Sequence, residues 1–117
     1  MIEKIVLDYL NAGLPSGIPA YMEKPEEDIP QRYVLIEKTG GGEENYIETA
    51  TIAIQSYAET LYHAAELNTA IKDLMRDITV PNTCITKATL NTDYNFTDPS
   101  KKQYRYQAVY DLVYLER

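Results

Sequence analysis

The stretch that decides the fold is residues 31–55, QRYVLIEKTGGGEENYIETATIAIQ. Residues 31–38 are rich in side chains that favour β-strands. Along residues 46–55 apolar and polar side chains alternate, with isoleucines on one face and threonines on the other, which is typical of an antiparallel strand with one buried face. The glycine-rich residues 39–45 lie between them. We therefore expect a β-hairpin whose tip is a flexible loop.

Two helices are expected to flank this hairpin. Residues 2–12 place apolar side chains at the i, i+3 and i+4 spacing of an amphipathic helix, and residues 57–77 repeat that spacing over a longer stretch. Ser56 and Glu59 have the Ser-x-x-Glu spacing of a capping box, in which each side chain bonds the other's backbone amide. The second helix should therefore begin directly after Ser56.

The rest of the chain is predominantly β in pattern. Residues 19–24 could form a short strand, while residues 83–91 and 103–116 alternate as strands on either side of a polar loop at 93–102. Strands and helices in this order favour an α+β fold, an antiparallel β-sheet with two helices packed on one face. Without an internal repeat or linker, residues 1–117 are expected to form a single domain.

Charge and hydropathy narrow the class of partner. The chain has 117 residues with 18 acidic and 11 basic side chains, so its formal charge is −7. Phosphate-driven binding requires a Lys- and Arg-rich surface, so we expect no specific nucleic-acid partner. Acids interrupt the apolar N-terminal stretch and no apolar run approaches the ~18 residues needed to cross a bilayer, so neither a signal peptide nor a membrane partner is expected. The lone Cys84 suits a reducing cytoplasm.

Residue patterns that would support catalysis are sparse. Glu59, His63 and Glu66 would share one face of the second predicted helix and could hold a divalent metal, but acids are common on exposed helix faces and we favour a solvated face. The glycine run at 40–42 is followed by two glutamates, whereas a phosphate-binding loop needs Lys-Ser/Thr. We therefore predict no catalytic residues, no cofactor and no metal, and hence no enzyme.

Tyrosine usage points instead to a protein-contact surface. The chain has 11 Tyr, one Phe and no Trp, and surplus tyrosine is common at half-buried surfaces and interfaces. Four tyrosines share one face of the last predicted strand, whose middle should lie in the core and whose start should lie nearer an exposed end. The loops at 39–45 and 93–102 bear partly opposite charges. The residues expected at an interface are Gly40, Gly41, Gly42, Glu43, Glu44, Lys101, Lys102, Tyr104 and Tyr106.

Four segments resemble a known family. They are residues 19–25 (PAYMEKP), 32–42 (RYVLIEKTGGG), 52–58 (IAIQSYA) and 64–68 (AAELN). Together they resemble the small head–tail joining proteins of long-tailed bacteriophages and prophages of Gram-positive bacteria, of the tail-terminator type. The resemblance covers roughly residues 1–80. It implies an antiparallel sheet flanked by helices and brings no catalytic residues.

The resemblance also implies an assembly and a location. Such proteins form a ring, usually a hexamer, that caps the finished tail tube and meets the head connector. The expected partners are therefore further copies of this chain, the tail tube protein and the head connector protein. The expected location is the virion, at the head–tail interface, after assembly in the host cytoplasm. Two alternatives stay open: a head-completion, connector or minor capsid protein of the same particle, and a small cytoplasmic ligand-binding or enzymatic α+β domain.

Overall fold

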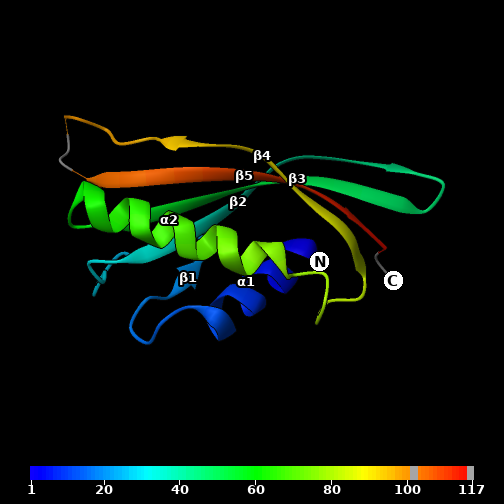
Figure 1. Ribbon diagram of the computed structural model, residues 1–117, viewed down its shortest axis with the longest axis horizontal. Coiled ribbons are helices and arrows are strands. Elements are labelled where there is room, and N and C mark those ends of the chain that lie inside the picture. Colours follow the sequence, from blue (N-terminus) through cyan, green and yellow to red (C-terminus); the bar gives the residue numbers. More distant parts are fainter. Residues whose placement is uncertain (101–102, 116–117) are drawn as a thin grey trace.

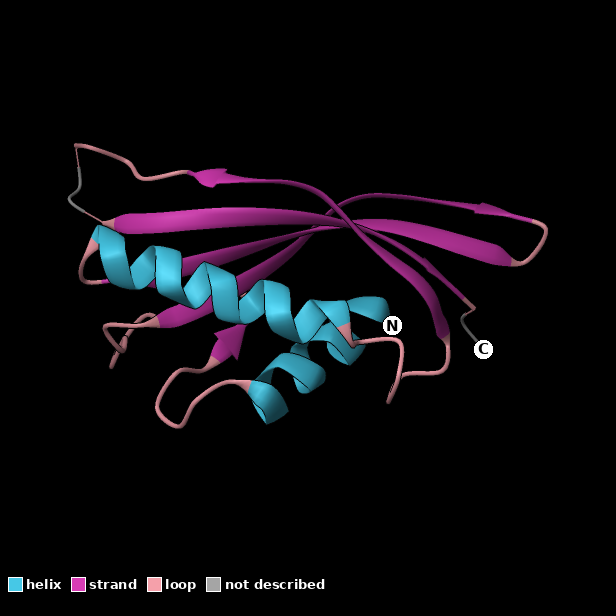
Figure 2. Cartoon of the chain, in the orientation of Figure 1, coloured by secondary structure: helices cyan, strands magenta, loops and turns pink. Residues whose placement is uncertain are grey.

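A computed structural model describes residues 1–100 and 103–115. Figure 1 shows the course of the chain through its two helices and five strands, and Figure 2 distinguishes them by type. In chain order these elements are α1 (Ile2–Gly13), β1 (Ala20–Tyr21), β2 (Tyr33–Glu44), β3 (Ile47–Ala58), α2 (Leu61–Arg76), β4 (Ile85–Asn95) and β5 (Tyr104–Tyr114).

The five strands form one sheet in the order β1-β2-β3-β5-β4. The pairs β2–β3, β3–β5 and β4–β5 are antiparallel, whereas the two-residue β1 runs parallel to β2, with Ala20 beside Val34. The predicted α+β class is therefore confirmed, with one parallel edge in an otherwise antiparallel sheet. Short connections join β2 to β3 and β4 to β5, whereas α2 is the crossover that links β3 to β4, two strands that run parallel to each other on either side of β5.

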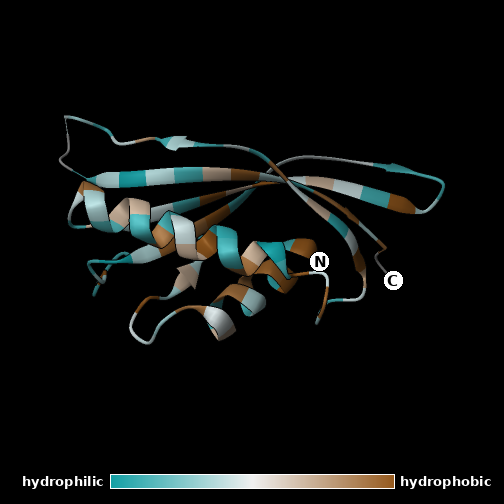
Figure 3. Cartoon of the chain, viewed as in Figure 1, coloured by the Kyte–Doolittle hydropathy of each residue, from teal (hydrophilic) through white to brown (hydrophobic). Residues whose placement is uncertain are grey.

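Both helices cover the same face of the sheet (Figure 2). Apolar and polar residues alternate along much of β3 and β5 (Figure 3), as expected for strands with a face toward a core. The helix-facing side chains form a core with the apolar stripes of α1 and α2. Members of this core that are at most 2% exposed include Val6, Leu10, Val34, Ile36, Ile52, Ile54, Ile71, Met75 and Leu112.

Strand β5 turns its tyrosine face toward the helices, as expected. Tyr110 and Tyr114 are buried in the core cluster, whereas Tyr104 and Tyr106 are half-buried at the start of the strand. The predicted division between a buried middle and a more exposed beginning is therefore confirmed.

The prediction of a flexible loop at residues 39–45 is wrong. Strand β2 continues through the three glycines to Glu44, which pairs with Ile47, and a bulge between Lys38 and Gly40 absorbs one extra residue. The extended β3 backbone, which pairs with β5 as far as residue 48, provides the template for this extension. A Cβ atom at Gly41 would lie 2.9 Å from the Thr49 carbonyl oxygen, so only glycine fits there without a shift.

The predicted start of the second helix is also wrong. Ser56 and its two successors belong to β3, and α2 begins at Leu61 with Thr60 as its N-cap. The Thr60 hydroxyl accepts a hydrogen bond from the His63 amide at 3.1 Å. Ser56 is fully buried on the face toward the helices, because sheet pairing with β2 and β5 outweighs the local capping pattern.

Strand β4 is longer than the alternating pattern predicted. It extends to Asn95, so the first part of the expected loop at 93–102 pairs with β5, with Asp93 opposite Ala108. A single bridge between Asp98 and Gln103 follows. Lys101 and Lys102, which we expected at an interface, lie outside the described residues.

The core predicts a large cost for truncating Ile71, which is 0% exposed on the buried stripe of α2. Ile71→Ala should lower the free energy of unfolding by ~2–5 kcal/mol, because the lost transfer energy is compounded by a cavity. Urea unfolding followed by circular dichroism measures this difference. The matched control Thr69→Ala removes an exposed side chain from the same helix and should change stability by less than ~0.5 kcal/mol. Equal effects of the two substitutions would contradict this core assignment.

Candidate functional site

The β2–β3 hairpin projects beyond the helices (Figure 1). Strand β2 has no buried side chain after Ile36, and the first buried side chain of β3 is Ala50. The protein is correspondingly elongated, with extents of 45 × 26 × 26 Å. We call residues 43–48 the hairpin tip. It combines three glutamates with two exposed apolar side chains, Tyr46 at 89% and Ile47 at 46%.

The turn at the tip has an unusual second residue. Asn45 and Tyr46 have φ angles of 52° and 66°, so both adopt the left-handed region. Positive φ at both central residues is the requirement of a type I′ turn, for which Asn-Gly is the favoured sequence. Asparagine tolerates this region, whereas a bulky aromatic residue rarely occupies it. Tyr46 is therefore placed at the outermost point of the hairpin at a conformational cost.

The expected interface residues do not form one patch. Gly40, Gly41 and Gly42 lie in β2 and lead to Glu43 and Glu44 at the hairpin tip. Tyr104 and Tyr106 pair with Ala58 and Ser56, at the opposite end of β3 from the tip. At roughly 3.3 Å per residue, the ten residues between the two ends of β3 separate these groups by roughly 30 Å. The protein therefore presents two separate candidate contact regions.

The sheet face opposite the helices holds an aromatic and polar cluster that sequence reasoning missed. The rings of Tyr33 and Tyr57 stack at 4.7 Å between centroids, and the Arg105 guanidinium lies 4.3 Å from the Phe96 ring centroid. Arg105 Nη1 donates to the Tyr57 hydroxyl at 2.9 Å, which in turn donates to Gln55 Oε1 at 2.8 Å. These groups satisfy one another, so the cluster stabilises this face of the sheet.

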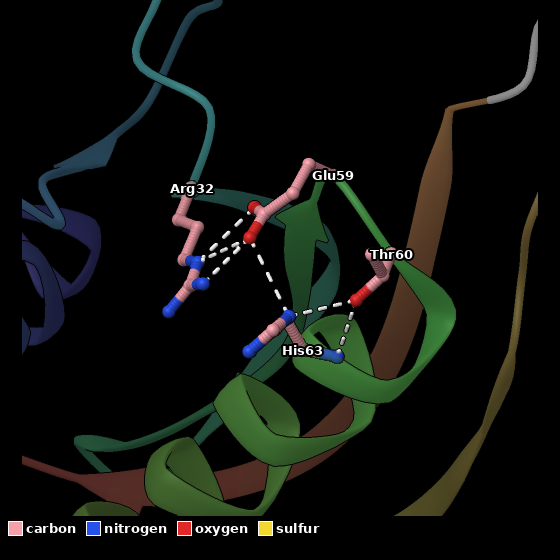
Figure 4. Close-up of polar contacts among 4 residues, drawn as sticks. All are labelled: Arg32, Glu59, Thr60 and His63. Carbon is pink, nitrogen blue, oxygen red and sulfur yellow. Dashed lines mark hydrogen bonds and ion pairs between the residues drawn. The ribbon is translucent and has the colours of Figure 1, made fainter.

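A second polar cluster joins the loop before β2 to the start of α2 (Figure 4). Arg32 donates from Nε and Nη2 to the Glu59 carboxylate, at 2.9 and 2.6 Å to Oε1. The hydrogen bonds from Arg32 lower the pKa of Glu59 to about 2. His63 lies on the other side of Glu59, with Nδ1 3.4 Å from Oε1 and 2.8 Å from the Thr60 hydroxyl.

This cluster separates Glu59 from the helix face on which the sequence pattern placed it together with His63 and Glu66. Glu59 precedes α2 rather than lying on it, and its carboxylate is held by Arg32. Within residues 1–100 and 103–115, no group of three His, Cys, Asp or Glu side chains could hold a metal ion. Glu66 is exposed on α2. Arg32 in the loop before β2 thus binds the Glu59 carboxylate and links this loop to the start of α2.

A hollow of about 280 Å³ lies between α2 and the edge strand β4, and we call it the α2–β4 groove. Leu90 is 41% exposed at this groove although its strand partner, Tyr110, is buried. Lys72 and Arg76 stand at its rim, with Lys72 Nζ 3.2 Å from Asp93. The lining residues are Lys72, Met75 and Arg76 from α2, Ala88 and Leu90 from β4, and Tyr110 from β5.

Comparisons with known proteins leave the family of the chain open. No protein-family model matches the chain, and no curated protein is significantly similar to it. Neither described helix is long and apolar enough to cross a membrane.

The Arg32–Glu59 pair predicts a pH-dependent contribution to stability. Because the pKa of Glu59 is lowered from 4.5 to about 2 on folding, the pair stabilises the protein fully above pH 4.5 and loses that effect as the pH falls toward 2. The difference in free energy of unfolding between wild type and Glu59→Gln should therefore shrink between pH 4.5 and pH 2. Denaturant titrations at several pH values measure it. In an Arg32→Gln background the pH dependence of that difference should be much weaker, and an unchanged one would contradict the role of Arg32.

Proposed function

We propose that this protein is a non-enzymatic structural subunit of a long-tailed bacteriophage or prophage, a tail terminator. It assembles as a ring, most simply a hexamer, that caps the tail tube and joins it to the head connector. The observation that supports this function best is the projecting hairpin with its exposed Tyr46 and Ile47. Exposed apolar side chains on a long projection are typical of a protein contact rather than of a substrate pocket.

The arrangement of polar groups supports the same proposal. Arg32 and Arg105 are each engaged within the subunit, by Glu59 and by Tyr57 respectively, so the strongest polar clusters already serve the fold. The hairpin tip differs, because its apolar side chains are exposed to solvent. Tyr46 is the most exposed of the large apolar side chains in the described residues, so the tip is available for contact with another molecule.

Shape and charge fit a ring that surrounds a channel. A closed ring needs two different complementary surfaces on each subunit, related by a rotation that closes. An elongated subunit with a projection at one end and half-buried tyrosines at the other offers such non-identical surfaces. A net charge of −7 per subunit disfavours adhesion of DNA, which suits a channel that DNA passes through.

Reversing the charge of the hairpin tip tests this function. The double variant Glu43→Lys and Glu44→Lys should lose tail capping, because these acids lie in the hairpin tip close to the exposed side chains of Tyr46 and Ile47. The matched control Glu26→Lys with Glu27→Lys makes the same charge change in the exposed loop before β2 and should retain capping. Sedimentation of the protein with purified tail tubes measures binding, and electron microscopy shows whether tubes acquire a terminal ring.

Two results would contradict the proposed function. One is a wild-type protein that stays monomeric and fails to bind tail tubes under conditions in which tubes join heads. The other is a genomic position without portal, capsid and tail-tube genes nearby, together with turnover or tight binding of a metabolite. The second result would favour the alternative of a small ligand-binding or enzymatic domain.

A further inference from the structure

We propose that Tyr46 at the hairpin tip of one subunit inserts into the α2–β4 groove of a second copy of this chain. The inference rests on the proposed function, because it names the contact through which the proposed ring closes. Three observations support it: the conformation of Tyr46, the incomplete apolar floor of the groove, and the charges that surround both.

The conformation of Tyr46 gives the first argument. Its φ of 66° lies in the left-handed region, where glycine would satisfy the same type I′ turn without strain. Its side chain is 89% exposed, so the subunit itself gains little packing in return. Strained positions that the fold does not require are typical of functional sites. A phenol ring at the outermost point of a projection can bury a large apolar area in a neighbour.

The α2–β4 groove offers a matching receptor. Met75, Ala88, Leu90 and Tyr110 give it an apolar part, and it lies where α2, which packs mainly on β3 and β5, leaves the edge strand β4 largely uncovered. Leu90 is 41% exposed on the face of the sheet that elsewhere is packed under the helices. The groove has a volume of about 280 Å³, which is ample for one aromatic side chain. The aromatic ring of Tyr46 inserted here would complete the apolar core at this edge of the sheet.

Opposite charges favour contact between the acidic hairpin tip and the rim of the α2–β4 groove. Glu43 and Glu44 flank Tyr46 on one strand of the hairpin, whereas the groove has Lys72 and Arg76 at its rim. Arg76 is exposed and donates through Nη1 to Asp73 at 3.0 Å, an i,i+3 pair on the helix surface. A guanidinium has five N–H donors, so the Arg76 fork can engage a second carboxylate. Lys72 is likewise paired, with Asp93 at 3.2 Å, so each tip carboxylate would share its cation with an acid of the receiving subunit.

The contact joins unlike surfaces and so fits a closed ring. Each subunit contributes its tip to one neighbour and its groove to the other, which is a heterologous interface. The tip cannot reach the groove of its own subunit. Leu90 pairs with Tyr110, which in turn pairs with Ile52, six residues along β3 from Tyr46. That spacing corresponds to roughly 20 Å.

Tyr46→Gly separates assembly from folding. Glycine suits the turn, so the variant should unfold at the same temperature as wild type or higher, while association weakens at least tenfold because the inserted ring is lost. The matched control Tyr62→Gly removes another exposed tyrosine, 71% exposed on the first turn of α2, and should leave association unchanged. Sedimentation velocity, with tail tubes added if the ring forms only on them, measures association. Unchanged association of Tyr46→Gly would overturn the inference while leaving the proposed ring intact.

Cysteine cross-linking tests the pairing directly. In a Cys84→Ser background, Tyr46→Cys combined with Leu90→Cys should give a ladder of oligomers on oxidation that ends at the ring size. Each single cysteine should give no ladder. Dimers from Tyr46→Cys alone, or no ladder from a ring that has assembled, would overturn the inference.

Exchanging the charges of Glu44 and Arg76 tests the proposed contact independently. Glu44→Lys should weaken association, and adding Arg76→Glu to it should restore at least part of the loss. No recovery together with a normal ladder from the cysteine pair would show that Arg76 is not the partner and would overturn the charge argument. A wild-type chain that forms no ring with or without tail tubes would refute the proposed function and the inference together.

Discussion

The whole structure depends on the central strand β3 being buried on both faces along half its length. Ile52 and Ile54 face the helices, while Ala53 and Tyr57 are buried on the opposite face. Strands β2 and β5 hydrogen-bond to its two edges over almost its entire length. A strand surrounded in this way has its register strongly specified, since a slip of one residue would exchange its two faces. The positions of the hairpin tip and of the tyrosine face of β5 follow from that register.

The parts of the fold that were predictable from the sequence are those with a strong period. The apolar stripe of residues 2–12, the alternation through Ile52 and Ile54, and the tyrosine face of β5 all lie where the residue pattern indicates. The errors arose where long-range pairing outweighs local chemistry. The three glycines suggest a loop, but β3 provides a paired edge that keeps them extended. Ser56 belongs to a plausible capping box, yet β2 and β5 hold it in a strand.

The candidate contact regions were predictable only in part. Acidic residues at 43 and 44 do lie on an exposed projection, but nothing in the sequence indicates that Tyr46 adopts a left-handed turn at its end, because that position usually holds glycine. The Arg32–Glu59 ion pair joins residues 27 positions apart, so no local sequence pattern indicates it. The α2–β4 groove exists because α2 packs mainly on β3 and β5 and leaves the edge strand β4 largely uncovered, a relation that is visible only in three dimensions.

The central claim is that this chain is a ring subunit whose hairpin tip contacts the next subunit. Cryo-electron microscopy of the assembled particle, with tail tubes present, tests it most directly. The account predicts a closed ring in which residues 43–48 of each copy lie against α2 and β4 of the neighbouring copy. A ring in which these tips point into solvent or toward the tail tube, or single copies without a ring, would contradict it.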